Sequence, residues 1–309
     1  MKHFFYSFFL IFSSLLLSSA CTGARKSILP TPETTCLFKL LKAMPEYGFM
    51  YGHHDDTVYG IGWYGDSARS DVKSVCGDYP GIISFDISGI EYGRRFNIDS
   101  VAFCRIREEA VNQYERGGVV SFSWHLNNPV TGGNAWDVSD TSVVEKILDQ
   151  DSIHKKFSGW LDRVADFINS VKDEKGVRVP VIFRPFHENT GNWFWWGAKY
   201  CSPREYKALW KFTYEYLKNK GVNNVLFAYS PGGDDSVAYA DRYPGDDFVD
   251  VLGIDIYQNG LSGRGEYLRE MKDMLGFLTA FGKQHSKPIA VTETGLVTIP
   301  DHEWWTKTL

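Results

Sequence analysis

The run VPVIFRPFHENTGNWFWWG, residues 179–197, places a glutamate just after an apolar strand and follows it with a loop rich in tryptophan. Its opening residues are typical of a strand that is covered on both faces. A second run, PIAVTETG at 288–295, repeats the arrangement of an apolar strand and a glutamate. In a β/α barrel the catalytic groups lie at the carboxyl ends of the strands. The two runs therefore predict a barrel with Glu188 and Glu293 at one rim.

Apolar runs and amphipathic segments alternate along the rest of the chain. Five further runs are predicted strands: 49–51, 81–85, 119–124, 225–229 and 251–256. Apolar residues recur at helical spacing in four segments: 101–116, 153–171, 203–218 and 267–285. This alternation predicts right-handed crossovers and a parallel sheet, so the expected fold class is α/β, a (β/α)8 TIM-type barrel. No GxGxxG or GxxxxGK(S/T) motif follows the first strand, which argues against nucleotide binding.

Polar side chains gather where the predicted strands end. They are His53, His54, Asp55, Asp56, Asp86, His125, Asn127, Asn128, Asp255 and Tyr257. One such residue alone would more simply be a helix cap or a structural hydrogen-bonding group. Their recurrence on most strands predicts a functional rim, because strands covered on both faces are otherwise apolar.

Two carboxylates that face one pocket suit the cleavage of a glycosidic bond, which needs a proton donor and an ionised partner. Arg184, Phe186 and Glu188 alternate along the chain, so a regular strand would point all three to the same side. Arg184 would then lie deeper in the barrel, below Glu188.

The same alternation of Ile289, Val291 and Glu293 would aim Glu293 into the barrel. Arg184 would hold this carboxylate ionised, because a nearby opposite charge favours the charged form. Tyr257 would lie on the neighbouring strand and donate a hydrogen bond to it. We therefore predict Glu293 as the nucleophile and Glu188 as the acid/base.

Length, charge and aromatic content limit which classes of partner the protein can bind. The 309 residues are enough for one barrel, which commonly needs roughly 250. A formal net charge of -5 without a Lys/Arg run argues against nucleic acid. Aromatic residues make up 16% of the chain and include 10 Trp, and their flat apolar faces suit sugar rings.

The first residues predict export. A short basic start, an apolar stretch and small residues before Cys21 are typical of a secretory signal at 1–20. The apolar stretch is too short for a transmembrane anchor. We expect a lipid on Cys21, with ordinary signal cleavage as the alternative, and a location in the periplasm or on the surface of a bacterium. Residues 21–35 are a predicted linker, and 36–309 are the predicted catalytic barrel.

The remaining cysteines do not define a disulfide framework. Disulfides are permitted in an exported protein, and these four cysteines allow three pairings: Cys36, Cys76, Cys104 and Cys201. We expect buried free thiols with at most one bridge. No CxxC and no Cys/His cluster is present in the sequence, which argues against a structural zinc site of that kind.

The two glutamate runs resemble glycoside hydrolase family 26, whose members are mostly β-mannanases in the barrel clan with catalytic glutamates on strands four and seven. The similarity extends over about 49–295 and includes the motifs YGH at 51–53, SWH at 123–125 and GIDIY at 253–257. The resemblance implies Glu188 as acid/base and Glu293 as nucleophile. It also implies five substrate-binding or supporting residues: His125, His187, Trp193, Tyr257 and, as a further sugar platform, Trp136. Trp195 and Trp196 would either pack the rim or contact sugar.

The resemblance further implies an exported, retaining endo-β-1,4-mannanase that acts on mannan, glucomannan or galactomannan. We expect a monomer that needs no cofactor or metal, because the carboxylates supply both proton transfer and nucleophilic attack. Two alternatives stay open. One is another family 26 β-glycanase, namely a mixed-linkage glucanase, a β-1,3-xylanase or a mannobiose-releasing exo-enzyme. The other is a non-catalytic glycan-binding protein on the same scaffold.

Barrels of this family have an eighth strand after the nucleophile, and it contributes a tryptophan to the site. The last residue, Leu309, is predicted to lie within the helix after strand seven. We therefore expect a barrel without its last βα unit in this sequence, either as a piece of a longer protein or as a shortened and impaired form. Weak solubility or activity of the 309 residues is expected in either case.

Overall fold

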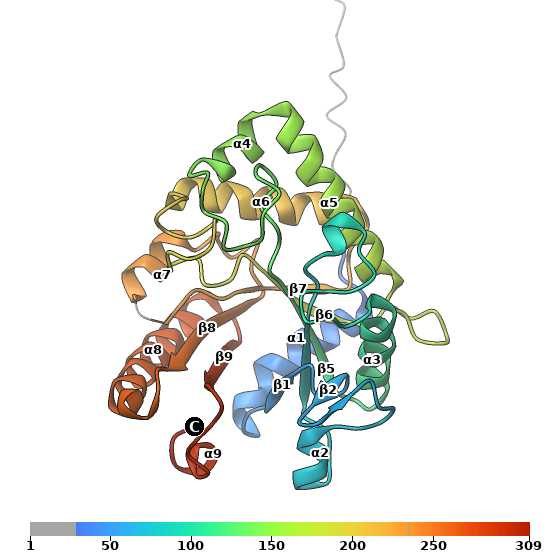
Figure 1. The fold of residues 1–309 in the computed structure, drawn as a ribbon, viewed down its shortest axis with the longest axis vertical. Coiled ribbons are helices and arrows are strands. Elements are labelled where there is room, and N and C mark those ends of the chain that lie inside the picture. Colours follow the sequence, from blue (N-terminus) through green and yellow to red (C-terminus); the bar gives the residue numbers. More distant parts are fainter. Residues whose placement is uncertain (1–28, 234) are drawn as a thin grey trace, which may run out of the picture.

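The computed structural model describes residues 29–233 and 235–309. Seven parallel strands form one curled sheet of the TIM-type β/α barrel, in the order β1-β4-β5-β6-β7-β8-β9 (Figure 1). Their bounds are β1 Gly52–His54, β4 Ile82–Asp86, β5 Val119–Trp124, β6 Val181–Pro185, β7 Val225–Tyr229, β8 Val251–Gln258 and β9 Ile289–Leu296. Within the described residues β1 pairs only with β4, and β9 pairs only with β8.

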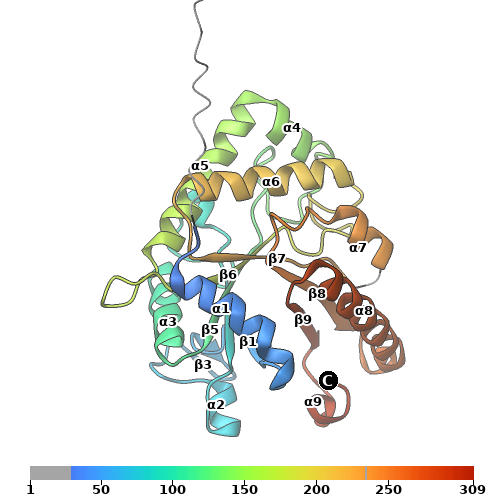
Figure 2. The same cartoon turned by 180° about the vertical axis from the view of Figure 1, so that it is seen from behind.

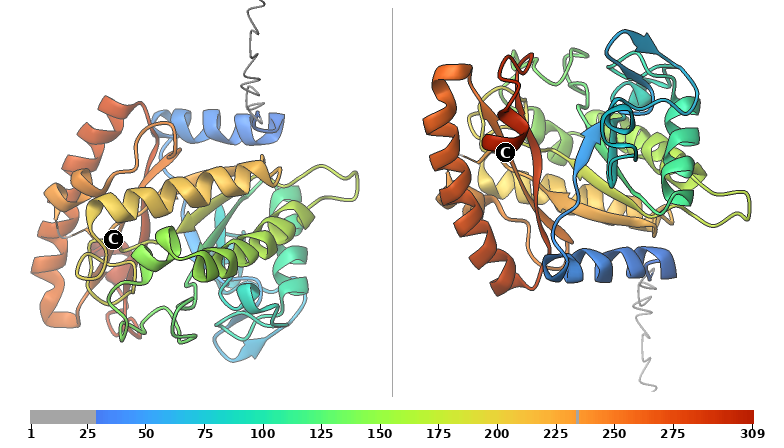
Figure 3. Two further views of the ribbon diagram at one scale, coloured as in Figure 1. Left: turned by 90° about the horizontal axis from the view of Figure 1, so that it is seen from above. Right: turned by 90° about the horizontal axis from the view of Figure 1, so that it is seen from below.

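Helices lie around the sheet, as the predicted alternation requires (Figure 3). The α-helices are α1 Pro32–Ala43, α2 Asp71–Cys76, α3 Phe103–Glu115, α4 Val143–Asp149, α5 Asp151–Ser170, α6 Pro203–Asn219, α7 Ser236–Arg242, α8 Arg264–His285 and α9 Trp304–Lys307. The short 3-10 helices are η1 Met44–Glu46, η2 Ile90–Tyr92 and η3 Leu261–Gly263. The start of α6 shows why a helix begins where it does. Ser202 and Glu205 form a reciprocal capping box, which satisfies backbone donors at the first turn.

Side chains of the strands alternate between two apolar clusters. The inner cluster fills one end of the barrel with Val119, Ile182, Leu226, Ala228 and Val251. Leu37 of α1 joins this cluster, so α1 closes that end of the barrel, and it crosses the strands in Figure 2. The larger cluster lies between the outside of the strands and the surrounding helices. Burial on both faces explains why the strands are apolar throughout.

The structure corrects several predicted boundaries. The first strand is 52–54 and not 49–51, and Phe49 is largely exposed. Residues 32–35 of the predicted linker form the first turn of α1, because Thr31 caps the helix and Pro32 suits its first position. The last strand continues through Glu293 to Leu296. The sequence patterns also gave no sign of the small hairpin of β2 Tyr59–Gly60 and β3 Trp63–Tyr64.

The predicted signal at 1–20 and Cys21 lie outside the described residues. In the part of the chain that is described, no helix is long and apolar enough to cross a membrane.

Candidate active site

Glu188 reaches the barrel rim from an irregular turn. β6 ends at Pro185, and both Phe186 and Glu188 have a left-handed backbone with φ of 52°. Phe186 consequently turns away from the site and packs on Trp210 of α6, which contradicts the prediction that it shares a side with Arg184. The Glu188 amide donates to the Ser230 carbonyl at 2.7 Å. Trp193 Nε1 donates to Glu188 Oε2 at 2.7 Å, which leaves Oε1 for other chemistry.

We call residues 186–201 the acid loop. Its two central tryptophans are fully buried. Trp195 Nε1 donates to the Leu126 carbonyl at 3.3 Å, and Trp196 Nε1 donates to the His187 carbonyl at 2.8 Å. Of the two roles considered for these residues, packing of the rim is therefore the one that the structure supports.

Hydrogen bonds from Arg242 hold the acid loop in place, and this residue was not among those predicted from the sequence. Arg242 of α7 is buried and donates to three groups of the loop: Asn189 Oδ1 at 2.8 Å, the Cys201 carbonyl at 2.7 Å and the Trp196 carbonyl at 3.2 Å. A guanidinium suits this role because its donors have a fixed planar arrangement. Glu188 thus projects from a loop whose backbone is held at several points.

Glu293 enters the site through a break in strand pairing. Val291 pairs with Ile254 and Glu293 pairs with Asp255, so Thr292 is an extra residue in β9. Ile289 lies against Gly282 of α8, on the outside of the barrel. Simple alternation from Ile289 would therefore have placed Glu293 outside as well. The bulge reverses the alternation and turns Glu293 inward, so the predicted position is right but the predicted parity is not.

Arg184 binds two carboxylates at the centre of the site. Its Nη1 donates to Asp255 Oδ2 at 2.8 Å and to Ser230 Oγ at 3.1 Å, and its Nη2 donates to Glu293 Oε1. Tyr257 donates to the other oxygen of Glu293 at 2.7 Å. The predicted support of Glu293 by Arg184 and Tyr257 is thus present in the structure.

The two glutamates lie close together, but their pKa values are shifted in opposite directions. One oxygen atom from each of Glu188, Asp255 and Glu293 lies within 4.8 Å of the other two. Burial and the neighbouring Glu293 charge raise the pKa of Glu188. Burial alone would raise the pKa of Glu293 too, but the Arg184 guanidinium and the other groups around the carboxylate, among them the Tyr257 donor, together outweigh burial and hold this pKa far below its usual range. One carboxyl is therefore suited to carry a proton, and the other is suited to stay ionised.

Two histidines lie beside the glutamates. His125 Nδ1 lies 2.7 Å from Asp86 Oδ2, and His125 Nε2 lies 3.0 Å from His187 Nε2. His187 is fully buried, and its Nε2 lies 4.0 Å from Glu293 Oε1. Burial and then Arg184 lower the pKa of His187 well below its ordinary value, so this ring is neutral. For His125, burial lowers the pKa, but the Asp86 carboxylate together with Glu293 more than compensates, so the pKa is raised.

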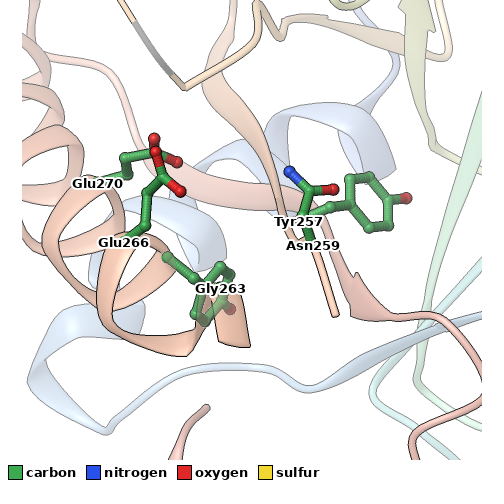
Figure 4. Close-up of a pocket in the computed structure, with 6 residues that line it drawn as sticks. Tyr257, Asn259, Gly263, Glu266 and Glu270 are labelled. Carbon is green, nitrogen blue, oxygen red and sulfur yellow. The ribbon is translucent and has the colours of Figure 1, made fainter. Parts of the chain in front are cut away.

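Three aromatic side chains at the rim are open to solvent. Trp136, Trp193 and Tyr257 are each 45% exposed. Trp136 stacks on His125 with ring centroids 5.3 Å apart and 14° between the planes. Tyr257 also borders a cavity of about 80 Å³ between the end of β8 and α8 (Figure 4). The other residues that line this cavity are Asn259, Gly263, Glu266, Tyr267 and Glu270.

The structure brings the predicted site residues together: Arg184, His125, Trp136, His187, Glu188, Trp193, Tyr257 and Glu293. It adds three polar groups to them. Asp86 and Asp255 were noticed only as strand-end residues, and Ser230 was not noticed because a serine after an apolar strand is an ordinary feature.

Comparison with known proteins points to one family. Residues 28–292 match the model described as Glycosyl hydrolase family 26. The chain is 33% identical over 278 residues to a mannan endo-1,4-beta-mannosidase of Bifidobacterium adolescentis, covering 86% of this chain and 27% of that protein. It is 28% identical over 262 residues to a mannan endo-1,4-beta-mannosidase of Bacillus subtilis, covering 79% of this chain and 64% of that protein. It thus spans less than two thirds of these curated relatives.

Solved structures give the same result. A GH26 beta-mannanase from Bacteroides ovatus is 54% identical with a TM-score of 0.88, over 90% of this chain and 81% of that one. A modular endo-beta-1,4-mannanase from Cellulomonas fimi is 35% identical with a TM-score of 0.79, over 87% of this chain and 61% of that one.

Proposed function

Because the chain belongs to glycosyl hydrolase family 26, we propose that it is an endo-β-1,4-mannanase that cleaves β-mannan with retention of configuration. The observation that supports the mechanism is that one oxygen of Glu188 and one oxygen of Glu293 lie within 4.8 Å of each other. Retaining glycosidases keep their carboxyl groups about 5–5.5 Å apart, whereas inverting enzymes need roughly 6.5–9.5 Å to admit a water. The names of the relatives support mannan as the substrate.

In the first step, Glu293 attacks the anomeric carbon and forms a covalent bond to the sugar. Glu188 gives its proton to the glycosidic oxygen as the bond to the leaving sugar breaks. Arg184 and Tyr257 keep Glu293 ionised and oriented, since each binds one of its oxygens. Trp193 occupies Oε2 of Glu188 as a donor, so the transferable proton belongs on Oε1.

In the second step, Glu188 is ionised and removes a proton from a water molecule. The water attacks the same anomeric carbon, and the bond to Glu293 breaks with its electron pair returning to the carboxylate. Two displacements restore the original β configuration. We place His125, His187 and Trp193 around the cleaved bond and Trp136 at a more distant sugar.

Substrate assays and product analysis test this proposal. Purified protein is given mannan, glucomannan, galactomannan, lichenan and β-1,3-xylan, and reducing ends are measured. Mannans should be cleaved fastest, with a mixture of oligosaccharides early in the reaction. Preferred cleavage of lichenan or xylan would favour another β-glycanase, and mannobiose as the only early product would favour an exo-enzyme. Binding without any cleavage would favour a glycan-binding protein.

Proton NMR tests the stereochemistry. The first product should show the β-anomer signal, with the α-anomer growing later through mutarotation. An initial α-anomer would mean inversion and would overturn the assignment of Glu293 as nucleophile.

We also propose that the protein is an exported monomer with a lipid on Cys21. The support is the signal-like composition of residues 1–20 and the small residues before Cys21. Labelling with a radioactive fatty acid in a bacterial host should mark the wild type and not Cys21→Ala. Labelling of both would disprove the lipid site. Light scattering of protein without the first 28 residues would measure its mass in solution, and a dimeric mass would contradict the monomer.

A further inference from the structure

A second cluster of metal-ligating side chains lies at the end of β1, apart from the glutamate pair. It consists of His54, Asp55 and Asp99, with one ligand atom from each residue lying within 4.8 Å of the others. His54 and Asp55 follow one another at the end of the edge strand, and Asp99 lies in the loop between η2 and α3. The left-handed backbone at Asp55, with φ of 56°, lets consecutive side chains turn toward the same point.

Asp55 is the reason to expect a ligand here. Its side chain is fully buried, and no group makes a hydrogen bond of normal geometry to either carboxylate oxygen in the described part of the chain, although the Tyr59 hydroxyl is close enough to lower its pKa. A buried carboxylate without well-placed donors is unfavourable, because it loses its hydration and is only partly compensated. The nearest basic atom is His54 Nε2, at 3.4 Å from Asp55 Oδ2. A cation between these groups would neutralise Asp55.

We propose that His54, Asp55 and Asp99 bind a divalent transition-metal cation of the zinc class. His54 Nε2 lies 3.4 Å from Asp55 Oδ2 and 3.7 Å from Asp99 Oδ2. Ligands at about 2.1 Å from a tetrahedral metal are roughly 3.4 Å from one another, so small side-chain adjustments would suffice. One imidazole with two carboxylates favours zinc or a similar metal over calcium, which takes only oxygen ligands.

The surroundings of His54 suit a metal ligand. Its Nδ1 lies 2.7 Å from Ser84 Oγ, which fixes the ring and leaves Nε2 toward the carboxylates. Metal-binding histidines usually have such a partner on the second ring nitrogen. The side chains of His54 and Asp99 are 43% and 29% exposed, so a cation can enter from solvent and water can complete its coordination.

The site would have a structural role at the barrel rim. β1 pairs with one strand only in the described residues, and Asp99 belongs to a different connection. A shared cation would tie the end of this strand to that connection. A protonated His54 between the two carboxylates is the competing state of the same three groups.

Cobalt and zinc binding distinguish these states. Untagged protein is treated with a chelator, dialysed, and titrated with Co²⁺ and then Zn²⁺. We expect one equivalent of Co²⁺ with the visible absorption of a four-coordinate ion, displaced by Zn²⁺. His54→Gln and Asp99→Asn should each weaken binding at least tenfold, since even second-shell changes at metal sites cost about 10–100-fold. Both residues are partly exposed, so the variants are expected to fold, which circular dichroism checks.

His285→Gln is the control, because His285 pairs with a single aspartate, Asp246, at 2.7 Å and so lacks the second carboxylate of the proposed site. The control should bind as the wild type does, and Zn²⁺ should raise the melting temperature of these two proteins but not of the His54 and Asp99 variants. Absence of binding by the wild type, or equal binding by all four proteins, would overturn the proposal. A near-ultraviolet thiolate band would overturn it too, because the cobalt would then be on cysteine.

Discussion

At the scale of single residues, Arg184 gives the two glutamates different roles. It contacts Glu293 directly, whereas Glu188 is held by Trp193 and lies among buried groups. A direct ion pair favours the ionised form, and burial near another negative charge favours the protonated form. The chemical difference between two identical side chains thus comes from their neighbours.

Removal of the nucleophile should abolish the reaction. We expect Glu293→Ala to lose turnover by at least roughly 10⁴-fold, by analogy with the loss of other covalent nucleophiles. Azide should enter the freed space and restore product formation, giving the glycosyl azide of inverted configuration. Initial rates and NMR of the azide product measure both effects. Near-normal turnover by this variant would remove Glu293 from the mechanism.

Loss of the acid should depend on the leaving group. Glu188→Gln should slow oligosaccharide cleavage by about 10²–10⁴-fold, the usual contribution of general acid catalysis. Activated aryl glycosides should be affected far less in their first step, because their leaving groups need no proton. Rates on both substrate types are compared with Glu174→Gln, an exposed control. Equal losses on the two substrates would contradict the acid role.

The pH profile should respond to Trp193. Activity requires protonated Glu188 and ionised Glu293, so kcat/KM falls on the alkaline side as Glu188 loses its proton. Trp193 Nε1 stabilises the ionised form of Glu188, which lowers its pKa. Trp193→Phe removes this donor, and the alkaline limb should move to higher pH by up to about one unit. The exposed Trp305→Phe is the control, and an alkaline limb that stays in place or moves to lower pH would show that the hydrogen bond does not control Glu188.

At the scale of elements, we expect α1 to stabilise the fold only through the face that packs on the inner cluster. Leu37 is 6% exposed in the inner cluster, while Leu40 of the same helix is 42% exposed. Leu37→Ala should lower the free energy of unfolding by about 2–4 kcal/mol, because it leaves a cavity in the core. Leu40→Ala should change it by less than about 0.5 kcal/mol. Denaturant unfolding measures both, and equal effects would mean that α1 does not close the barrel as described.

The sequence predicted elements better than it predicted their irregularities. Runs such as 119–124 and 225–229 form strands with the predicted bounds, because burial on both faces makes them apolar throughout. Both glutamates could be found because each follows an apolar run. The parity arguments failed because a left-handed residue at Phe186 and an extra residue at Thr292 interrupt the alternation. Neither interruption has a distinctive residue type.

Long-range positioning groups could not be predicted at all. Arg242 holds the acid loop from α7, but an arginine in a short helix looks like a surface residue. Only its burial in the folded chain shows its role. Asp255 was visible as a strand-end carboxylate, but its contact with Arg184 depends on how the strands curl together.

At the scale of the whole molecule, the cysteines should be free. All four described cysteines are free thiols, and only Cys201 is buried, so the expectation of buried thiols is wrong for Cys36, Cys76 and Cys104. Burial raises the pKa of the Cys201 thiol to about 12. A thiol reagent should therefore modify three groups quickly in the native protein and the fourth only after unfolding. Fewer than three fast groups, counted on the chain without residues 1–28, would indicate a disulfide.

The two ends of the barrel have separate roles. Apolar side chains and α1 fill one end, and charged groups occupy the other. In directed evolution, these ends offer two nearly independent targets. Mutations near α1 can add a reserve of stability without moving a catalytic atom, and that reserve can then be spent on destabilising changes at the rim that alter sugar preference. A library that varies the α1 end first and the rim afterwards should therefore yield more active variants than one that varies the rim alone.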